Sequence, residues 1–224
     1  MKGDYMSNKE IQRNRMMRYF IDAAAEIIEN KGVDNVTIRN VANLAGYNSA
    51  TLYNYFDNLH HLISLACIKF LKDYVKDLPS YIAKANNTYE KTLYIWECFC
   101  VHTFEKPEIF ASIFIHSQQR TISGYIKDYY EIYPENLQDM SEDIRRMLTY
   151  NDLYDRTLVL LLQCHKDGYF NKEDLNDISE LSYFIYTGML LDILSNKYKG
   201  SVEEAVQKTM NYLKKLYNSF RINK

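Results

Sequence analysis

Residues 36–62 read VTIRNVANLAGYNSATLYNYFDNLHHL, and this stretch decides the fold. Thr37 can cap a short helix over residues 38–45, because its hydroxyl can accept a hydrogen bond from the first helical turn. Gly46 supplies the left-handed residue that ends such a helix, and Asn48 can cap the helix that follows. Two short helices around a tight turn are typical of a helix-turn-helix motif, whose second helix enters the DNA major groove.

The second helix of this motif begins with small polar residues. Ser49, Ala50 and Thr51 are short enough to let the helix enter the groove deeply. The apolar positions of the two helices face one another and would hold them together; they are Val41, Ala42, Ala45, Leu52 and Phe56.

The composition of the 224-residue chain favours helices throughout. Hydrophobic residues make up 47% and charged residues 25%, which is enough apolar material for a core. Only 7 Gly and 3 Pro are present, whereas a β-sandwich or barrel needs frequent turn residues. Apolar spacing, caps and glycines predict an all-α fold of about nine or ten helices, over roughly residues 8–31, 38–45, 49–56, 58–77, 88–105, 107–116, 123–133, 152–166, 174–196 and 201–220.

The layout of these helices predicts two domains. Residues 1–57 hold three helices that end in the helix-turn-helix, and residues 58–224 form a helical regulatory domain. Asp57 can cap the helix over residues 58–77, which would connect the two as a rigid lever about 30 Å long. The helix over residues 88–105 is apolar almost all round, which indicates that it is buried on every side.

Charge and cysteine content exclude several classes of protein. The net charge of −2 provides no global basic field for nucleic acid or an anionic membrane. A local cluster of Lys9, Arg13, Arg15 and Arg18 near the start predicts a modest phosphate affinity that depends on this arm. Four cysteines are too sparse for a disulfide scaffold, and no secretory signal or membrane-length apolar run is found. We therefore expect a cytoplasmic protein that does not insert into a membrane.

Cys98, Cys100 and His102 resemble a metal tract, but on one helix Cys100 points away from the other two side chains. Cys164 and His165 are adjacent and also point apart, so a thiol–imidazole pair is not expected. No glycine-rich phosphate loop, nucleophilic serine elbow or metal-ligand spacing is found. We expect no metal, no cofactor and no enzymatic activity, and we interpret the cysteines as buried and inert.

The pattern Thr37-x-Arg39-x-Val41-Ala42-x-x-Ala45-Gly46, followed by Thr51-Leu52-Tyr53-x-Tyr55-Phe56 and by Leu62, resembles the TetR/AcrR family of bacterial transcriptional regulators. The resemblance covers about residues 10–76. It implies a three-helix DNA-binding domain, a long connecting helix and a divergent helical domain that dimerises through its last two helices. The sequence departs from the family at Leu59, where many members carry a lysine that neutralises a phosphate.

The resemblance also implies a set of DNA contacts. Arg39 would touch a base or a phosphate, Ser49 and Ala50 would face bases, and Tyr53 would reach a phosphate or base edge. A helix N-terminus capped by Thr37 can itself hold a phosphate. The whole set comprises Thr37, Arg39, Asn48, Ser49, Ala50, Thr51, Tyr53, Asn54 and Tyr55.

The aromatic content of the second domain suggests a cavity. Residues 63–224 hold 16 Tyr, 8 Phe and the only Trp. Tyrosine joins an apolar ring to a hydroxyl, which suits a lipophilic ligand with a few polar groups, although these rings could equally be ordinary packing. The candidate lining residues, chosen around the apolar helix over 88–105, are Trp96, Phe99, Cys100, His102, Phe104, His116, Tyr125, Tyr129 and Tyr186.

The last two helices are the candidate dimer interface. Residues 201–220 carry the cleanest amphipathic stripe of the chain, and we expect it to pack against a second copy because one subunit alone would not bury it. Gly188 would permit close helix approach. The predicted seam comprises Leu181, Ile185, Gly188, Val206, Met210, Leu213 and Leu216.

These observations lead to one main hypothesis of function and two alternatives. The first is a homodimeric repressor that binds operator DNA and is released by a small lipophilic effector. The second is a DNA-binding protein of the same fold that is regulated by a protein partner. The third is an all-α enzyme or carrier in which the helix-turn-helix is vestigial.

Overall fold

A computed structural model describes residues 7–115, 122–138, 140–150 and 152–222. Within these residues the chain is helical and contains no strand, as the sequence predicts. Short 3₁₀ turns lie at Val33–Asn35, Pro134–Leu137 and Lys172–Asp174. The α-helices are α1 (Asn8–Lys31), α2 (Ile38–Ala45), α3 (Ser49–Leu52), α4 (Leu59–Lys69), α5 (Leu71–Ile82), α6 (Thr88–Glu105), α7 (Pro107–Phe114), α8 (Ile122–Ile132), α9 (Glu142–Thr149), α10 (Leu153–Lys166), α11 (Leu175–Leu194) and α12 (Val202–Phe220).

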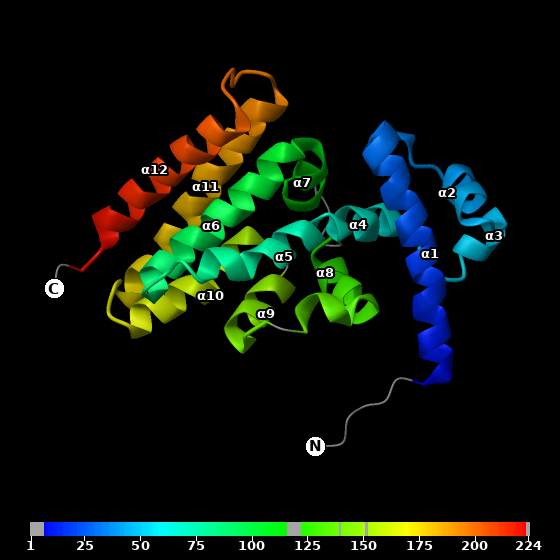
Figure 1. The fold of residues 1–224 in the computed structure, drawn as a ribbon, viewed down its shortest axis with the longest axis horizontal. Helices are drawn as coiled ribbons and strands as arrows, with labels where there is room; N and C mark the ends of the chain where they lie inside the picture. The colour runs from blue at the N-terminus through cyan, green and yellow to red at the C-terminus, as the bar shows by residue number, and fades with distance from the viewer. Residues whose placement is uncertain (1–6, 116–121, 139, 151, 223–224) are drawn as a thin grey trace.

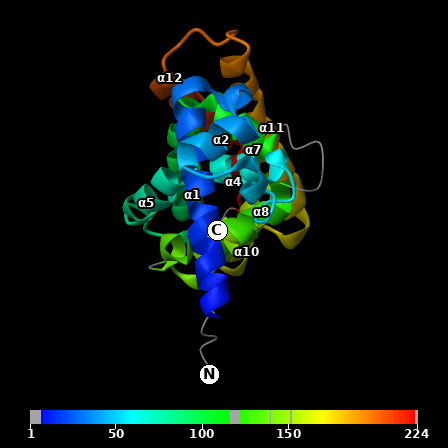
Figure 2. The same cartoon turned by 90° about the vertical axis from the view of Figure 1, so that its right-hand side faces the viewer.

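The helices form an elongated arrangement with α1, α2 and α3 at one end and α11 and α12 towards the other (Figure 1). Helices α4 and α5 run end to end between the two groups (Figure 1). A view onto the first end shows α1 and α2 in front of the remaining helices (Figure 2). The N-terminal helices therefore present an outer face that the other described residues do not cover.

Capping residues set many of the helix boundaries. Ser7 and Ser201 each form a capping box with a glutamate three residues later, and these boxes open α1 and α12. Thr37 opens α2 by accepting a hydrogen bond from the Asn40 amide at 3.1 Å. The predicted bounds of α1, α2 and α6 are confirmed, because polar side chains at these positions satisfy amides that the helix cannot pair internally.

Helix α3 is shorter than the predicted span over residues 49–56. It ends at Leu52, and the amides of Asn54 and Tyr55 bond the carbonyls of Thr51 and Leu52 in tight turns. After Leu52 the backbone changes direction, and this brings the Phe56 side chain into the core. Helix α3 therefore has a single turn, and a tight reversal connects it to α4.

The connecting helix consists of two segments and not the single predicted helix over residues 58–77. Asn58 and not Asp57 caps α4, by accepting a hydrogen bond from the His61 amide at 2.9 Å. The α-helical pattern is interrupted at Phe70, whose amide bonds the Cys67 carbonyl at 3.0 Å in a tighter turn. Apolar periodicity continues across the junction, so spacing does not reveal it. The division of the chain at residue 57 stays a prediction.

Helix α5 continues through Pro79 to Ile82, beyond the predicted end. Helix α9 was not predicted from the sequence, because its eight residues carry only a short apolar stripe, Ile144, Met147 and Leu148.

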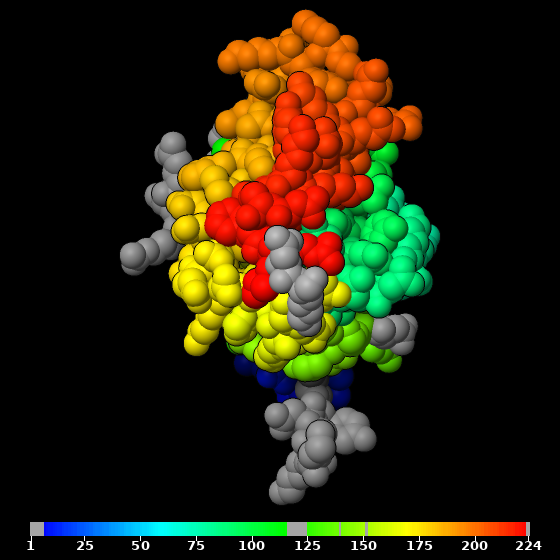
Figure 3. Space-filling model, turned by 90° about the vertical axis from the view of Figure 1, so that its left-hand side faces the viewer, coloured from blue at the N-terminus to red at the C-terminus, as the bar shows by residue number. Residues whose placement is uncertain are grey.

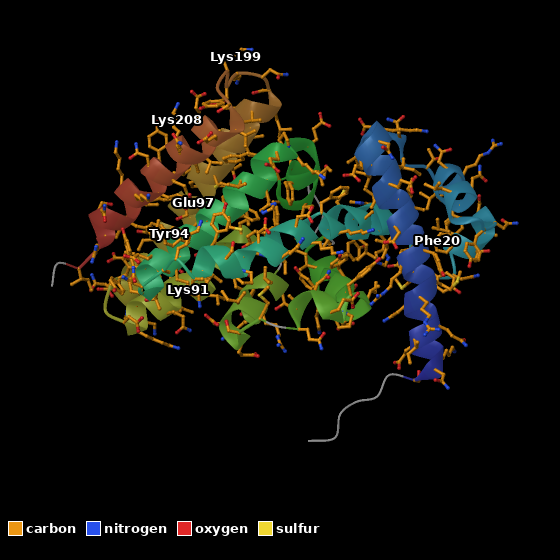
Figure 4. All side chains as sticks on the ribbon, viewed as in Figure 1. Phe20, Lys91, Tyr94, Glu97, Lys199 and Lys208 are labelled. Carbon is orange, nitrogen blue, oxygen red and sulfur yellow. The ribbon has the colours of Figure 1, made fainter. Side chains whose placement is uncertain are left out.

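Helix α6 lies at the centre of the C-terminal part, and most of its side chains are buried. The prediction of burial on every side is wrong for one strip, where Lys91, Tyr94 and Glu97 are half-buried (Figure 4), because the neighbouring helices leave this face partly open. Helices α5, α10 and α12 pack along it, and α7 and α11 also contact it. The Trp96 indole donates a hydrogen bond to the Tyr217 hydroxyl at 3.1 Å, which ties α6 to α12. The Ser182 hydroxyl donates to the same oxygen at 3.4 Å and connects α11.

The amphipathic stripe of α12 is buried within the chain itself. Val206, Met210 and Leu213 are buried against the chain's own helices, chiefly α6 and α11, and Leu216 is half-buried. The expectation that these residues need a second copy is therefore wrong, since the spacing of a stripe shows that a face is covered but not what covers it. The opposite side of α12 forms part of the molecular surface (Figure 3).

We expect Leu213→Ala to destabilise the protein rather than only separate subunits. Leu213 is fully buried, so its truncation leaves a cavity that costs about 2–5 kcal/mol of the free energy of unfolding. Urea unfolding followed by circular dichroism measures this loss. Lys214→Ala, at the exposed neighbouring position, should change stability by less than about 0.5 kcal/mol; equal stability of the two variants would contradict the buried placement.

Candidate nucleic-acid interface and internal pocket

The turn between α2 and α3 is built by backbone hydrogen bonds around Gly46. Gly46 has φ +76°, and its amide bonds the Asn43 carbonyl at 3.2 Å. The Tyr47 amide bonds the Ala42 carbonyl at 2.9 Å, which completes a Schellman motif. A side chain at position 46 would be strained in this conformation, so glycine fixes the angle at which α3 leaves α2.

The outward side of α2 and α3 carries most of the predicted DNA contacts. Arg39, Ala50, Tyr53 and Asn54 are exposed, and Ser49 and Thr51 are half-buried. Tyr53 is 58% exposed although it is a large aromatic residue. Its ring therefore lies outside the domain core and is available to a partner.

Three other members of the predicted set have structural contacts of their own. The Thr37 hydroxyl caps α2, and the Asn48 side-chain oxygen accepts the Ala50 amide at 2.9 Å. The Tyr55 ring is half-buried, with its centroid 6.0 Å from that of Phe20. These residues shape the surface, and a direct DNA contact by each of them stays a prediction.

Phe20 of α1 holds the motif in place. Its ring is fully buried and lies edge-on to Phe56 at 6.0 Å and tilted against Tyr47 at 5.4 Å between centroids. Figure 4 labels this residue midway along α1. One ring thus contacts the α2–α3 turn on one side and the reversal after α3 on the other.

The basic N-terminal arm is partly used inside the protein. Arg13 donates to the carbonyls of Asn54 and Tyr55, each at 3.2 Å, and fixes the end of the α3 reversal. Arg18 pairs with Glu135 at 2.9 Å and bonds the Ile132 carbonyl. Two of the four cationic groups of the arm thus make contacts within the protein, and the phosphate affinity of the arm stays a prediction.

Helix α8 packs against α1 and α4, and the His61 imidazole of α4 lies in its contact with α8. The His61 ring stacks on Tyr125 with 4.3 Å between centroids, and its Nδ1 atom accepts the Asp57 amide at 3.3 Å. Its Nε2 atom is buried with no hydrogen-bond partner among the described residues. Burial lowers the pKa of His61 below its ordinary value of 6.5, although nearby Asp57 and Asp128 act in the opposite direction.

A small pocket of about 20 Å³, room for about one water molecule, lies where α5, α6, α9 and α10 meet. Tyr74 of α5 and Phe99 of α6 meet edge-on at 5.4 Å, and Trp96 of α6 is 3% exposed. The lining residues are mostly apolar or aromatic: Tyr74, Ile95, Trp96, Phe99, Met147, Leu153, Arg156, Thr157 and Leu160.

Arg156 is the charged member of this lining. It is 4% exposed, its Nε atom donates to the Tyr150 carbonyl and its Nη2 atom to the Leu148 carbonyl, each at 2.9 Å. The guanidinium carbon lies 5.3 Å from the centre of the Phe114 ring. Burial lowers the pKa of Arg156 from its ordinary value, and the Tyr130, Tyr74 and Asp152 side chains act in the opposite direction.

The structure separates the predicted ligand-binding residues. Trp96 and Phe99 line the pocket. Phe104 and Tyr186 are buried and stack on each other at 5.6 Å but do not line it, and Cys100 is buried elsewhere on α6. The His102 Nε2 atom lies 3.2 Å from a carboxylate oxygen of Asp77, which links α6 to α5. The His102 ring does not line the pocket.

The remaining candidates lie elsewhere. Tyr125 stacks on His61, and Tyr129 stacks on Tyr133 at 4.7 Å, so both belong to the packing of α8. His116 lies outside the described residues. Sequence reasoning gathered these side chains by type, and only three-dimensional packing decides which of them meet.

The sequence did not lead to the pocket-lining residues that come from α5, α9 and α10. The sequence signal that could have found Arg156 is its place on the same helix face as Leu153 and Leu160, two residues before the start of the apolar run at residues 158–162. A charge on an apolar helix face is rarely buried without a reason.

The cysteines are all buried and free. Burial raises the pKa of the Cys67 and Cys98 thiols to about 12, so neither is a thiolate nucleophile near neutral pH. Within the described residues no group of His, Cys, Asp and Glu side chains is placed to hold a metal ion. No helix in this part of the chain is both long and apolar enough to cross a membrane.

The exposed side of α11 carries an apolar stripe. Leu181, Phe184 and Leu191 are 39%, 56% and 42% exposed, and they lie on one helix face with Ile185 and Gly188. An added Cβ at Gly188 would meet nothing within 4 Å. Val202 and Tyr212 of α12 are also exposed, at 36% and 43%.

A family model described as bacterial regulatory proteins of the tetR family matches residues 20–63. The HTH-type transcriptional regulator BetI of Brucella canis is 31% identical over 123 residues, which cover 54% of this chain. The BetI protein of Brucella abortus matches equally well. The chain spans 61% of the length of these curated relatives.

Solved structures share the fold. FadR of Thermus thermophilus, a TetR-family transcriptional repressor in complex with lauroyl-CoA, gives a TM-score of 0.59 at 14% identity over 88% of this chain and 92% of that one. A protein of Saccharomonospora viridis in complex with choline also gives 0.59 at 14% identity, over 93% and 99% of the two chains. At such identity the likeness concerns the fold alone.

The buried His61 predicts that stability falls on mild acidification. The folded pKa lies below the unfolded value of 6.5, so the unfolded chain binds more protons as the pH falls through that value. Stability should be steady above about pH 7 and decrease towards about pH 5.5. Thermal unfolding at these pH values measures the difference, which His61→Phe should reduce and the exposed-site variant His60→Gln should leave intact. The same decrease in His61→Phe as in the parent would disprove this origin.

Proposed function

The chain belongs to the TetR family of bacterial regulatory proteins, and from that premise we propose that it binds a specific double-stranded operator and regulates transcription from it in the cytoplasm. The observation that carries this proposal is the outward face of α2 and α3. Arg39 and Tyr53 lie on it, exposed, and their side chains make no hydrogen bond to the described residues. The turn at Gly46 sets the angle of this surface, which can enter the major groove of DNA.

Each element of the motif has a distinct part in this proposal. The short side chains of Ser49 and Ala50 let α3 approach base edges, and Tyr53 extends from the end of α3 to a phosphate or base edge. Arg39 of α2 contacts the backbone where α2 crosses it. Thr37 and Asn48 fix the helix starts, and Arg13 fixes the reversal behind them.

The operator complex has few charge contacts. Arg39 is the single arginine or lysine within residues 36–62, and Leu59 is half-buried against the core where a phosphate-binding lysine is absent. Each neutralised phosphate contributes a slope of roughly 0.9 to the dependence of log affinity on log salt. The proposal therefore includes a shallow salt dependence and a large share of polar contacts.

A homodimer is the assembly that this function requires. A twofold complex reads two half-sites roughly 34–36 Å apart on one face of DNA. The exposed stripe of Leu181, Phe184 and Leu191 on α11 supports dimerisation at that helix, because water-exposed apolar residues in a row gain free energy when a second copy covers them. This stripe replaces the buried residues of α12 as the proposed seam.

A small molecule is the proposed effector, which releases a repressor from its operator. Solved proteins of this fold hold lauroyl-CoA or choline. The pocket beside α6 is the proposed place, because Trp96 lines it and bonds Tyr217 of α12, while Tyr74 lines it from the connector α5. It has room for about one water molecule, so an effector there must move the surrounding helices apart.

Helix α8 offers the route from pocket to DNA. Arg156 in the pocket bonds the carbonyls at the end of α9, and α9 packs against α8. Helix α8 in turn contacts the N-terminal helices through the His61–Tyr125 stack and through Arg18, which bonds the Ile132 carbonyl. A ligand that fits one arrangement of these helices better than another shifts the balance between DNA-bound and released forms.

We expect Tyr53→Ala and Arg39→Ala to weaken operator binding without unfolding the protein. Each change removes a contact worth about 1–3 kcal/mol, or roughly fivefold to over a hundredfold in affinity. Fluorescence anisotropy with a duplex selected from random sequence by the parent protein measures the loss. Lys76→Ala on α5 is the control and should bind like the parent, whereas parent-like binding by Tyr53→Ala and Arg39→Ala would overturn the assignment of this face.

Charge within the α11 stripe should separate the subunits. Phe184→Glu adds a carboxylate at a position that is 56% exposed in one chain, so the monomer tolerates it and the dimer does not. Sedimentation velocity should show a monomer with unchanged helicity, while Lys76→Glu on α5 stays dimeric. A dimeric Phe184→Glu protein, or a monomeric parent, rejects the proposed interface.

A further inference from the structure

Helix α1 and the α2–α3 turn share an exposed aromatic surface beside the predicted DNA contacts. Tyr47, which directly precedes the α3 cap Asn48, is 38% exposed, and Tyr19 of α1 is 59% exposed. Their ring centroids lie 6.5 Å apart, so the two rings connect α1 to the turn. Arg15 is also exposed and lies one helical turn before Tyr19, on the same side of α1. We call Arg15, Tyr19 and Tyr47 the α1 strip.

The polar groups of the α1 strip have no partner within the described part of the chain. The hydroxyls of Tyr19 and Tyr47 make no hydrogen bond there, and the Arg15 guanidinium makes neither a hydrogen bond nor an ion pair there. The neighbouring arginines differ, because Arg13 and Arg18 both donate to backbone carbonyls of the protein. The α1 strip therefore presents two hydroxyl donors and one cation to whatever lies in front of the motif.

Packing fixes the position of the Tyr47 hydroxyl. The Tyr47 ring is tilted against the fully buried Phe20 ring, with 5.4 Å between centroids. The Tyr47 amide bonds the Ala42 carbonyl at 2.9 Å, so the backbone at this position is held as well. A donor that is already held in place loses little conformational entropy when it binds a partner.

We propose that the α1 strip is a phosphate-binding part of the DNA interface, in which the Tyr19 and Tyr47 hydroxyls donate to phosphate oxygens of the DNA backbone. The proposal rests on the proposed function, because it extends the same surface. The start of a recognition helix enters the major groove, so residues beside that start come close to the phosphates at the groove edge. Tyrosine hydroxyls are among the side-chain groups that contact phosphates in protein–DNA complexes.

Neutral donors fit the charge pattern of this domain. Arg39 is the single arginine or lysine within residues 36–62, so the motif itself offers one cation to the DNA backbone. A neutral hydroxyl can bind a phosphate without replacing a counterion, and its contribution to affinity adds nothing to the salt dependence. Arg15 adds a cationic contact whose contribution does depend on salt.

Changes of tyrosine to phenylalanine test the hydroxyls and keep the ring packing. Tyr19→Phe and Tyr47→Phe should each lower the affinity for a duplex selected from random sequence by the parent protein by about tenfold, since a hydrogen bond to a charged oxygen is worth about that factor. Fluorescence anisotropy over a range of salt concentrations measures this loss. Tyr212→Phe, at an exposed tyrosine of α12, should bind like the parent.

Two further readouts distinguish a phosphate contact from a base contact. A duplex of scrambled sequence should lose the same factor, because phosphates carry no sequence information, and the slope of log affinity against log salt should stay unchanged in both phenylalanine variants. Arg15→Gln should instead make that slope shallower by roughly 0.9.

A single methylphosphonate, moved along the backbone of the selected duplex, locates the contact of Tyr47. At one or more positions this uncharged substitute should weaken binding by the parent and leave binding by Tyr47→Phe unchanged. The absence of any such position contradicts a phosphate contact by this hydroxyl.

The outcomes separate this inference from the proposed function. Parent-like affinity of either phenylalanine variant, while Tyr53→Ala weakens binding, refutes the α1 strip and leaves the DNA-binding proposal standing. A loss confined to the selected duplex means that the tyrosines read bases, and it also refutes the phosphate contact. A protein that selects no duplex refutes the proposed function and the α1 strip with it.

Discussion

Helix α6 buries most of its side chains, and the helices that follow the motif are arranged to cover them. Helices α5, α10, α11 and α12 supply this cover, and a strip with Lys91, Tyr94 and Glu97 stays half-buried. One side chain in the cover breaks the apolar pattern, because α10 brings Arg156 into the lining of the small pocket beside Trp96. The Leu148 and Tyr150 carbonyls accept hydrogen bonds from its guanidinium, so the end of α9 holds this buried charge.

At the N-terminal end of the molecule, apolar packing also decides which side chains are exposed. The Phe20 ring gathers the apolar residues of α2 and α3, and the polar side chains that remain are forced outward. Tyr53 is exposed because Phe20, Leu52 and Phe56 already fill the small core. The exposed face of α2 and α3 therefore arises where the aromatic packing beneath it is complete.

The sequence was sufficient for features that depend on neighbouring residues. Thr37, Gly46 and Asn48 mark helix ends through local hydrogen bonds, and these boundaries were predicted. The apolar character of α6 correctly predicted that most of it is buried, but it did not reveal the half-buried strip with Lys91, Tyr94 and Glu97. The features that were not predicted depend on residues far apart in the chain. The stripe of α12 did not reveal that α6 and α11 cover it, and tyrosine content did not reveal that Tyr74 lines the pocket while Tyr125 stacks on His61.

The outward face of α2 and α3 is tested most directly by comparing two duplexes: one selected from random sequence by the protein, and one with the same bases in scrambled order. Fluorescence anisotropy measures the affinity of the protein for each duplex over a range of salt concentrations. The selected duplex should bind at least about a thousandfold more tightly. Its log affinity should fall only shallowly with log salt, because Arg39 is the single arginine or lysine within residues 36–62. Equal affinity for the two duplexes would contradict a sequence-specific DNA-binding surface on these helices.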